Sequence, residues 1–162
     1  MADPTKDPKT GSTRDTETVE RLIPAPAAAI FALLADPSRH REIDGSGTVR
    51  DAADGAQQLT LGSTFGMSMK AGIPYSMAST VIEFEQDRRI AWQTRAPLRA
   101  MRLFIGGRIW RYQLEPTAGG TLVSETWDIS QERVPMLIRP LRGSTRKAMT
   151  ATLQKIEEIV TA

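Results

Sequence analysis

The stretch GRIWRYQLEPTAGGTLVSETWDIS, residues 107–130, decides the fold because it has the pattern of two β-strands joined by a turn. In both halves, large apolar residues alternate with polar ones, as expected for strands with one buried face. Pro116 and Gly119-Gly120 mark the turn between them. Glu125 breaks the pattern, because its phase is that of Trp127 and places a carboxyl group on the apolar face.

Shorter strand patterns precede this hairpin, and helical patterns flank the strand region. We expect strands over 18–23, 48–53, 64–70, 75–85 and 89–95, short helices over 27–35 and from 37 to about 43, a turn over 134–138, and a long helix from about residue 144. On that long helix, an apolar stripe comprises Met149, Leu153, Ile156 and Val160. The fold class is therefore α+β, with a curved antiparallel sheet of about seven strands wrapped around the C-terminal helix.

The composition restricts the classes of function. A chain of 162 residues favours a single domain, which we place at 17–162, after a polar tail over 1–16 that we expect to be disordered. A net charge of only +2 argues against a nucleic-acid partner. The absence of cysteine excludes disulfides and thiolate chemistry and fits the cytoplasm, which is the location we predict. We also expect neither a secretory signal nor a transmembrane segment, because no long apolar run exists.

Four segments of the sequence are similar to those of a known superfamily. They are IPAPAAAIFALLADPSRHREID (23–44), RRIAW (88–92), WRYQLEP (110–116) and GGTLVSETWD (119–128). Together with the order of elements, they resemble the START-like, Bet v 1-like (SRPBCC) helix-grip fold, and specifically its polyketide cyclase/dehydrase and lipid-transport group. The resemblance covers residues 17–160 and implies a cavity between the concave sheet and the terminal helix. It implies no single activity, because the group includes cyclases, lipid and quinone carriers, and binders of hormones or secondary metabolites.

Large apolar and aromatic side chains share the predicted concave face, as in typical small-molecule sites. The candidate ligand-binding residues are Phe65, Met67, Met69, Trp92, Trp110, Tyr112, Glu125 and Trp127. The alternative is that these side chains only fill the core beneath the helix.

Glu125 and Tyr112 are the candidate catalytic residues if the protein is an enzyme. A carboxylate on an apolar face must be paired, protonated or near water. It could serve as a general acid or base or as a ligand partner, but an ion pair with an arginine is the interpretation we favour here. Arg111 has the opposite phase and should face solvent. His40, the only histidine, lies in a polar helix and is expected at the surface, so we predict no metal site and no cofactor.

Two segments, 97–107 and 132–143, combine arginines with apolar residues. This mixture suits a cavity mouth for acidic or amphipathic ligands, or contact with an anionic membrane surface. Two solvated loops packed on each other would show the same composition.

The function that we predict is binding, with transport as an extension, of a small hydrophobic or aromatic ligand between the sheet and the C-terminal helix. One alternative is a cofactor-free polyketide cyclase or dehydratase, and a second is a protein-interaction module. The sequence leaves the ligand and the choice between monomer and homodimer open.

Overall fold

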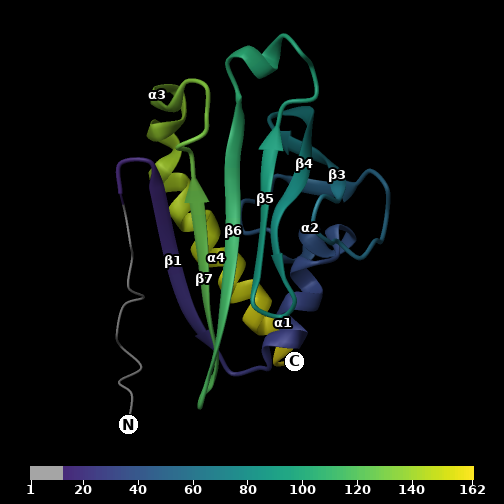
Figure 1. The fold of residues 1–162 in the computed structure, drawn as a ribbon, viewed down its shortest axis with the longest axis vertical. Helices are drawn as coiled ribbons and strands as arrows, with labels where there is room; N and C mark the ends of the chain where they lie inside the picture. The colour runs from purple at the N-terminus through teal and green to yellow at the C-terminus, as the bar shows by residue number, and fades with distance from the viewer. Residues whose placement is uncertain (1–12) are drawn as a thin grey trace.

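One curved sheet of seven antiparallel strands forms the frame of the protein in the computed structural model, which describes residues 13–162 (Figure 1). The strands are β1 (Thr16–Ile23), β2 (Val49–Ala52), β3 (Thr64–Ala71), β4 (Ile73–Glu85), β5 (Arg89–Arg95), β6 (Gly106–Thr117) and β7 (Gly120–Asp128). Their order across the sheet is β1-β7-β6-β5-β4-β3-β2. All strands after β1 therefore follow a meander, and β1 pairs with the last strand. The predicted α+β class and antiparallel meander are confirmed.

The α-helices lie where the sequence indicated, after the first strand and in the C-terminal part of the chain. After β1 come α1 (Ala27–Leu34), a 3₁₀ turn η1 (Pro37–Arg39) and α2 (His40–Ile43), and after β5 comes a second 3₁₀ turn, η2 (Met101–Leu103). The C-terminal part contains α3 (Pro135–Ile138), η3 (Arg139–Leu141) and α4 (Arg142–Val160). The long helix begins two residues before the predicted start, because Pro140 lies in η3 and does not interrupt α4.

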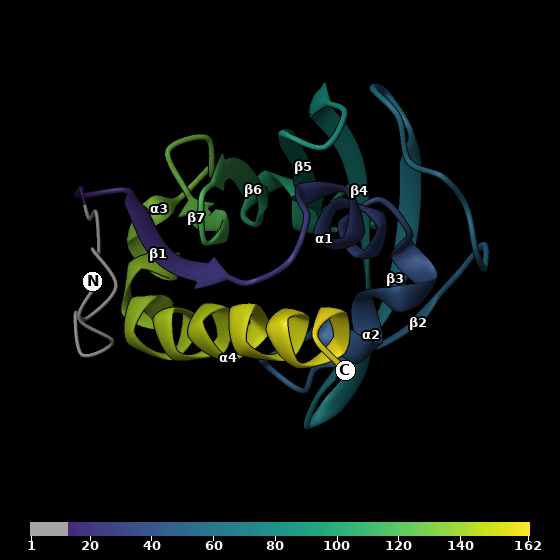
Figure 2. The ribbon, with the colours of Figure 1, turned by 90° about the horizontal axis from the view of Figure 1, so that it is seen from below.

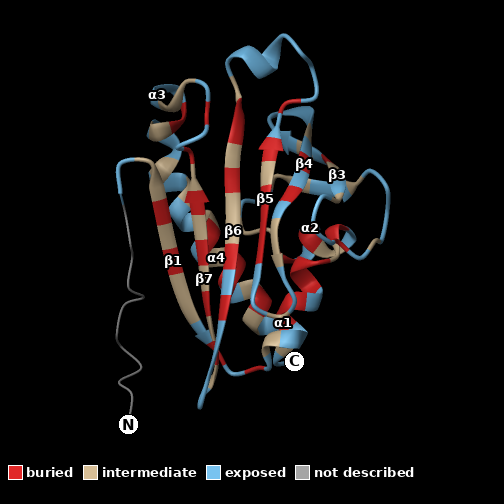
Figure 3. Ribbon diagram, viewed as in Figure 1, coloured by how far each residue is buried: buried red, intermediate tan, exposed pale blue. Residues whose placement is uncertain are grey.

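The long helix α4 packs across the concave face of the sheet and forms the second layer (Figure 2). Its predicted stripe faces the core, because Met149, Leu153 and Ile156 are at most 1% exposed, while Val160 is partly buried and packs against the core. Burial is concentrated along the middle strands and on the inner faces of the helices, as Figure 3 shows. This arrangement is a helix-grip-like fold, in which the core lies between α4 and the sheet.

A buried carboxylate joins the first strand to the last helix. Glu17 is fully buried, and its Oε1 lies 2.6 Å from Nε of Arg146, while its Oε2 lies 3.4 Å from Arg142. Arg21 of β1 also forms an ion pair with Glu157 of α4. Because breaking such a pair leaves an uncompensated buried charge, these contacts fix the position of α4 against β1.

The segment preceding β1 contacts the same end of the helical region. Asp15 lies 2.7 Å from Arg139, and Arg142 donates to the carbonyl of Thr13 at 2.8 Å. Residues 1–12 of the tail that we expected lie outside the described residues.

The loop after α2 approaches the backbone of α4 very closely. A Cβ atom at Gly45 would lie 2.1 Å from the carbonyl oxygen of Ala148 and 2.5 Å from the amide nitrogen of Thr152. The Gly45 amide also donates to the Thr152 hydroxyl at 3.0 Å. Only glycine permits this contact, which places α2 and its His40 beside the concave face.

We predict that Gly45→Ala lowers the free energy of unfolding by about 1 to 3 kcal/mol, because the added methyl group forces α2 away from α4. Urea unfolding monitored by circular dichroism measures the change. Gly143→Ala, in the first turn of α4 with open space around it, is the matched control. It should leave stability unchanged or raise it by up to about 1 kcal/mol. Equal stability of the two variants would contradict the prediction.

Candidate functional site

Tyr112 and Glu125 face each other across the hairpin formed by β6 and β7. The register of β6 against β7 pairs these two residues directly, so their side chains emerge on the same face of the sheet. The Tyr112 hydroxyl donates a hydrogen bond of 2.7 Å to Oε1 of Glu125. Tyr112 is 5% exposed and Glu125 is 2% exposed, so the hydrogen bond lies in the interior.

The predicted ion pair of Glu125 is wrong. Within residues 13–162 its hydrogen-bond partner is Tyr112, and no arginine forms a salt bridge with it. Burial raises the pKa of Glu125 to about 8, against the lowering effect of the Tyr112 hydrogen bond, and the charge of Asp44 raises it further. Glu125 is therefore a neutral carboxylic acid at pH 7. Burial and the negative charge of Glu125 also raise the pKa of Tyr112 well above its ordinary value.

The second oxygen of Glu125 has no hydrogen-bond partner in the described part of the chain. Because Oε1 accepts the tyrosine proton, the acid proton of the neutral form is placed on Oε2, where it is a donor. Trp127, two residues along β7 and on the same face, is fully buried, and its Nε1 has no hydrogen-bond partner among residues 13–162. The site thus contains two buried donors without acceptors, which is costly in a protein interior.

Aromatic rings extend from this pair across the sheet. The Trp92 ring lies 5.5 Å from the Tyr112 ring, 5.0 Å from the His40 ring on which it stacks, and 5.7 Å from the Phe65 ring. The structure therefore brings together four of the predicted site residues, Phe65, Trp92, Tyr112 and Glu125, and adds His40. Arg111, on the opposite face, forms an ion pair with Glu83 and does not contribute to the site.

The expected surface position of His40 is wrong. The residue is 7% exposed, and its Nε2 lies 2.9 Å from the carbonyl oxygen of Leu34. Burial lowers its pKa, so the ring is neutral at pH 7. Polar neighbours in the sequence obscured an inward stripe, because Pro37, His40 and Ile43 recur at helical spacing and all three are buried.

The remaining predicted residues surround this cluster. Met67 is buried, and Met69 and Trp110 are partly buried and pack against the core. Trp110 pairs in register with Trp92 on one side and with Trp127 on the other. All three tryptophans of the chain thus lie in one row across β5, β6 and β7.

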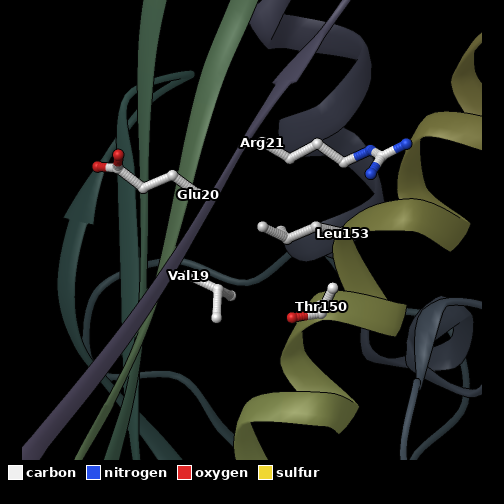
Figure 4. A pocket seen from close by; sticks show the side chains of 5 residues that line it. All are labelled: Val19, Glu20, Arg21, Thr150 and Leu153. Atoms are coloured by element: carbon white, nitrogen blue, oxygen red, sulfur yellow. The ribbon is translucent and has the colours of Figure 1, made fainter. Parts of the chain in front are cut away.

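Two hollows stand out among the described residues, and neither touches the Tyr112–Glu125 pair. A hollow of about 20 Å³ lies between β1 and α4, where Val19 and Arg21 face Thr150 and Leu153 while Glu20 points to the other side of the strand (Figure 4). It has room for about one water molecule. A surface hollow of about 320 Å³ lies at the β4–β5 turn, beside Arg88 and Glu115. Aromatic side chains pack beside the pair, in the region where the sequence predicted a cavity.

The described residues do not provide a metal site, because no three of their histidine, aspartate or glutamate side chains form a suitable group. None of the helices in residues 13–162 is long and apolar enough to cross a membrane.

The fold and its buried aromatic core are those of a helix-grip protein. The chain belongs to the polyketide cyclase/dehydrase and lipid transport family, whose family model matches residues 15–159. The resemblance stated above is thereby confirmed. The matched residues include the sheet, both helical regions and the Tyr112–Glu125 pair.

Among curated proteins, the chain is similar to two uncharacterised proteins from two strains of Mycobacterium tuberculosis. The identities are 40% and 39% over 122 residues, which make up 73% of this chain and 48% of each relative. The chain thus spans about half the length of the curated relatives that it matches.

Solved structures show the same fold. A Rhodobacter sphaeroides protein aligns with a TM-score of 0.73 and 15% identity, covering 94% of this chain and 97% of its own. A Mesorhizobium loti protein aligns at 0.67 with 18% identity, covering 90% and 96%. The di-domain aromatase/cyclase StfQ from the steffimycin biosynthetic pathway aligns at 0.66 with 10% identity, covering 90% of this chain and 50% of that chain.

We predict that Glu125 makes the protein less stable as the pH rises. Its pKa is 4.5 in the unfolded chain and about 8 in the folded one, so the folded state holds a proton that the unfolded state has lost. The stability that this bound proton contributes is fully present below pH 4.5 and is lost by about pH 8. Wild-type unfolding free energy should therefore fall by a few kcal/mol between these values.

Urea unfolding across that pH range tests this expectation. Glu125→Gln should remove most of the fall, because the amide is neutral throughout and still accepts from Tyr112. Glu115→Gln, on the exposed side of β6, is the control and should keep the wild-type slope. If the unfolding free energy of Glu125→Gln falls with pH as steeply as that of the wild type, Glu125 is already ionised in the folded state and the prediction is wrong.

Proposed function

We propose that this protein binds a small hydrophobic or aromatic molecule with an acceptor oxygen, such as a ketone, quinone or phenol, between its sheet and α4. The observation that carries this proposal is the pair of buried donors without acceptors, Oε2 of Glu125 and Nε1 of Trp127. A carbonyl oxygen of a ligand would satisfy both donors. The surrounding rings would bury the apolar remainder of the ligand, which supplies most of the binding free energy.

Membership of the polyketide cyclase/dehydrase and lipid transport family supports this class of ligand. The structural likeness to an aromatase/cyclase agrees with it, although at 10% identity that likeness concerns the fold alone.

Binding requires the aromatic cluster to open, because its rings contact one another. Met67 and Met69 line the same face of β3, and their unbranched side chains readjust at low cost. The pair formed by β2 and β3 is also the irregular end of the sheet, because the register shifts between Val49 and Ala52. A ligand would therefore enter by moving this side of the cluster away from α2.

We predict that 2-acetylnaphthalene binds more tightly than 2-ethylnaphthalene, which has the same size and no acceptor oxygen. Above pH 8 the affinity for the ketone should fall about tenfold, because ionised Glu125 can no longer donate. Quenching of tryptophan fluorescence measures both affinities, since all three tryptophans lie in the row beside the pair.

Two variants of Glu125 distinguish the effect of its hydrogen-bond donation from the effect of its side-chain shape. Glu125→Gln keeps a donor and should bind the ketone within a few-fold of wild type, with no dependence on pH. Glu125→Leu loses the donor and should bind both naphthalenes equally. Equal affinity of the wild-type protein for the two compounds would contradict the proposal, and so would the absence of binding by either.

A cofactor-free cyclase or dehydratase is the second candidate, and one observation favours it. A buried neutral carboxylic acid with a pKa of about 8, hydrogen-bonded to a tyrosine, is suited to general acid catalysis. Glu125 would transfer its proton to one carbonyl oxygen of a polyketone as an enol carbon of the same chain attacks that carbonyl carbon. The enol becomes a ketone by releasing its O–H proton, which returns to the Glu125 carboxylate. The rings would hold the chain in the folded pose that cyclisation needs.

We predict for this candidate that Glu125→Gln abolishes turnover of a synthetic polyketone thioester, because the amide cannot transfer a proton. Ligand affinity should stay within a few-fold of wild type. Product formation followed by mass spectrometry measures turnover, and Glu115→Gln should remain fully active. If the wild-type protein binds the thioester without converting it, the binding function stands and the catalytic one fails.

A further inference from the structure

Two loops at one end of the sheet expose large apolar side chains to solvent. In the β5–β6 loop, Leu98, Leu103 and Phe104 are 63%, 64% and 59% exposed. In the segment after β7, Met136 and Leu137 are 73% and 60% exposed. Figure 1 shows both in the upper part of the molecule, the β5–β6 loop beyond the ends of β5 and β6 and the α3 segment beyond the end of β7. Side chains of this size are exposed together when a surface has a partner.

The two loops form one surface because they are fastened to each other. Glu132 is buried, accepts a hydrogen bond of 2.8 Å from the Gly106 amide, and lies 3.4 Å from Nε of Arg108. The backbone of Gly107 has a φ of +116°, and a Cβ atom there would lie 2.0 Å from the carbonyl oxygen of Gln131. The start of β6 thus packs directly on the segment after β7. We call the combined surface, residues 97–105 and 133–141, the loop face.

Arginines accompany the apolar side chains of the loop face. Residues 95–108 include Arg95, Arg99, Arg102 and Arg108 and no acidic residue. From 130 to 147 there are four arginines and one lysine against a single acid, the buried Glu132. Asp15 pairs with Arg139, and Glu17 pairs with Arg142 and Arg146. Arg99 and Arg133, in contrast, are exposed and form no ion pair within the described chain. The exposed charge of the loop face is therefore positive.

We propose that the loop face docks on the surface of an anionic lipid bilayer. Leucine, phenylalanine and methionine side chains enter the boundary between headgroups and acyl chains, while the arginines contact lipid phosphates. A second copy of this chain is a poorer occupant, because it would place two positive surfaces against each other. A nucleic acid would leave the apolar side chains without a partner.

Co-sedimentation of the full chain with vesicles tests this proposal. The protein should bind vesicles of phosphatidylcholine mixed with phosphatidylglycerol. Its partition coefficient for vesicles of phosphatidylcholine alone should be at least about tenfold lower. Binding should weaken as the salt concentration rises. Equal binding to both kinds of vesicle, or binding to neither, would overturn the proposal.

Variants on the loop face separate its two components. Leu103→Ser with Phe104→Ser, and Arg99→Gln with Arg133→Gln, should each lower the partition coefficient at least about tenfold. The controls replace equally exposed residues elsewhere: Leu61→Ser with Ile73→Ser, and Arg50→Gln with Arg88→Gln. Circular dichroism should show native folding for all four proteins. Control variants that lose binding as strongly would overturn the proposal. So would a wild-type dimer, measured by light scattering, that only the loop-face variants dissociate, because a second copy would then be the occupant.

Discussion

The register of the central hairpin is the constraint on which the rest of the candidate site depends. It places a carboxyl group opposite a phenol in a sheet face that is otherwise apolar. Within residues 13–162 no cationic side chain pairs with this position, and burial raises the pKa of the group, so that it keeps its proton and becomes a donor. The protonated form is compatible with burial beside Trp92 and Trp127, because a neutral acid costs far less in an apolar interior than an unpaired carboxylate does.

A second buried glutamate, on the neighbouring strand β1, shows that the partner decides whether such a group is an ion-paired carboxylate or a neutral acid. Glu17 and Glu125 are both almost fully buried on the concave side. Glu17 meets two arginines from α4 and forms ion pairs that hold the layers together. Among the described residues, Glu125 hydrogen-bonds only to the Tyr112 hydroxyl group. The same side chain therefore serves as a structural anchor at one position and as a neutral polar group at the other, and the position of α4 makes the difference.

The elements of the fold could be predicted because each depends on a local pattern. Alternation in β6 and β7 and the apolar stripe on α4 both indicate structure without knowledge of distant residues. The partners of buried polar groups could not be predicted in this way. Whether Glu125 contacts Tyr112 or an arginine depends on which strands are neighbours, and the position of His40 depends on α2 approaching α4 through Gly45. The state of the cavity depends on side-chain packing over the whole interior, which no local pattern contains.

The pairing of β1 with β7 has a consequence for how the chain must fold. The strand that begins the domain hydrogen-bonds with residues 121–128, and its buried Glu17 pairs with Arg146 on the last helix. During synthesis β1 therefore remains without these partners until β7 and α4 have been made, while the meander from β2 to β6 can pair as it appears. Contacts between residues so far apart in sequence slow the search for the native state. We expect closure of this edge to be the last and slowest step of folding, with an unpaired strand exposed until then.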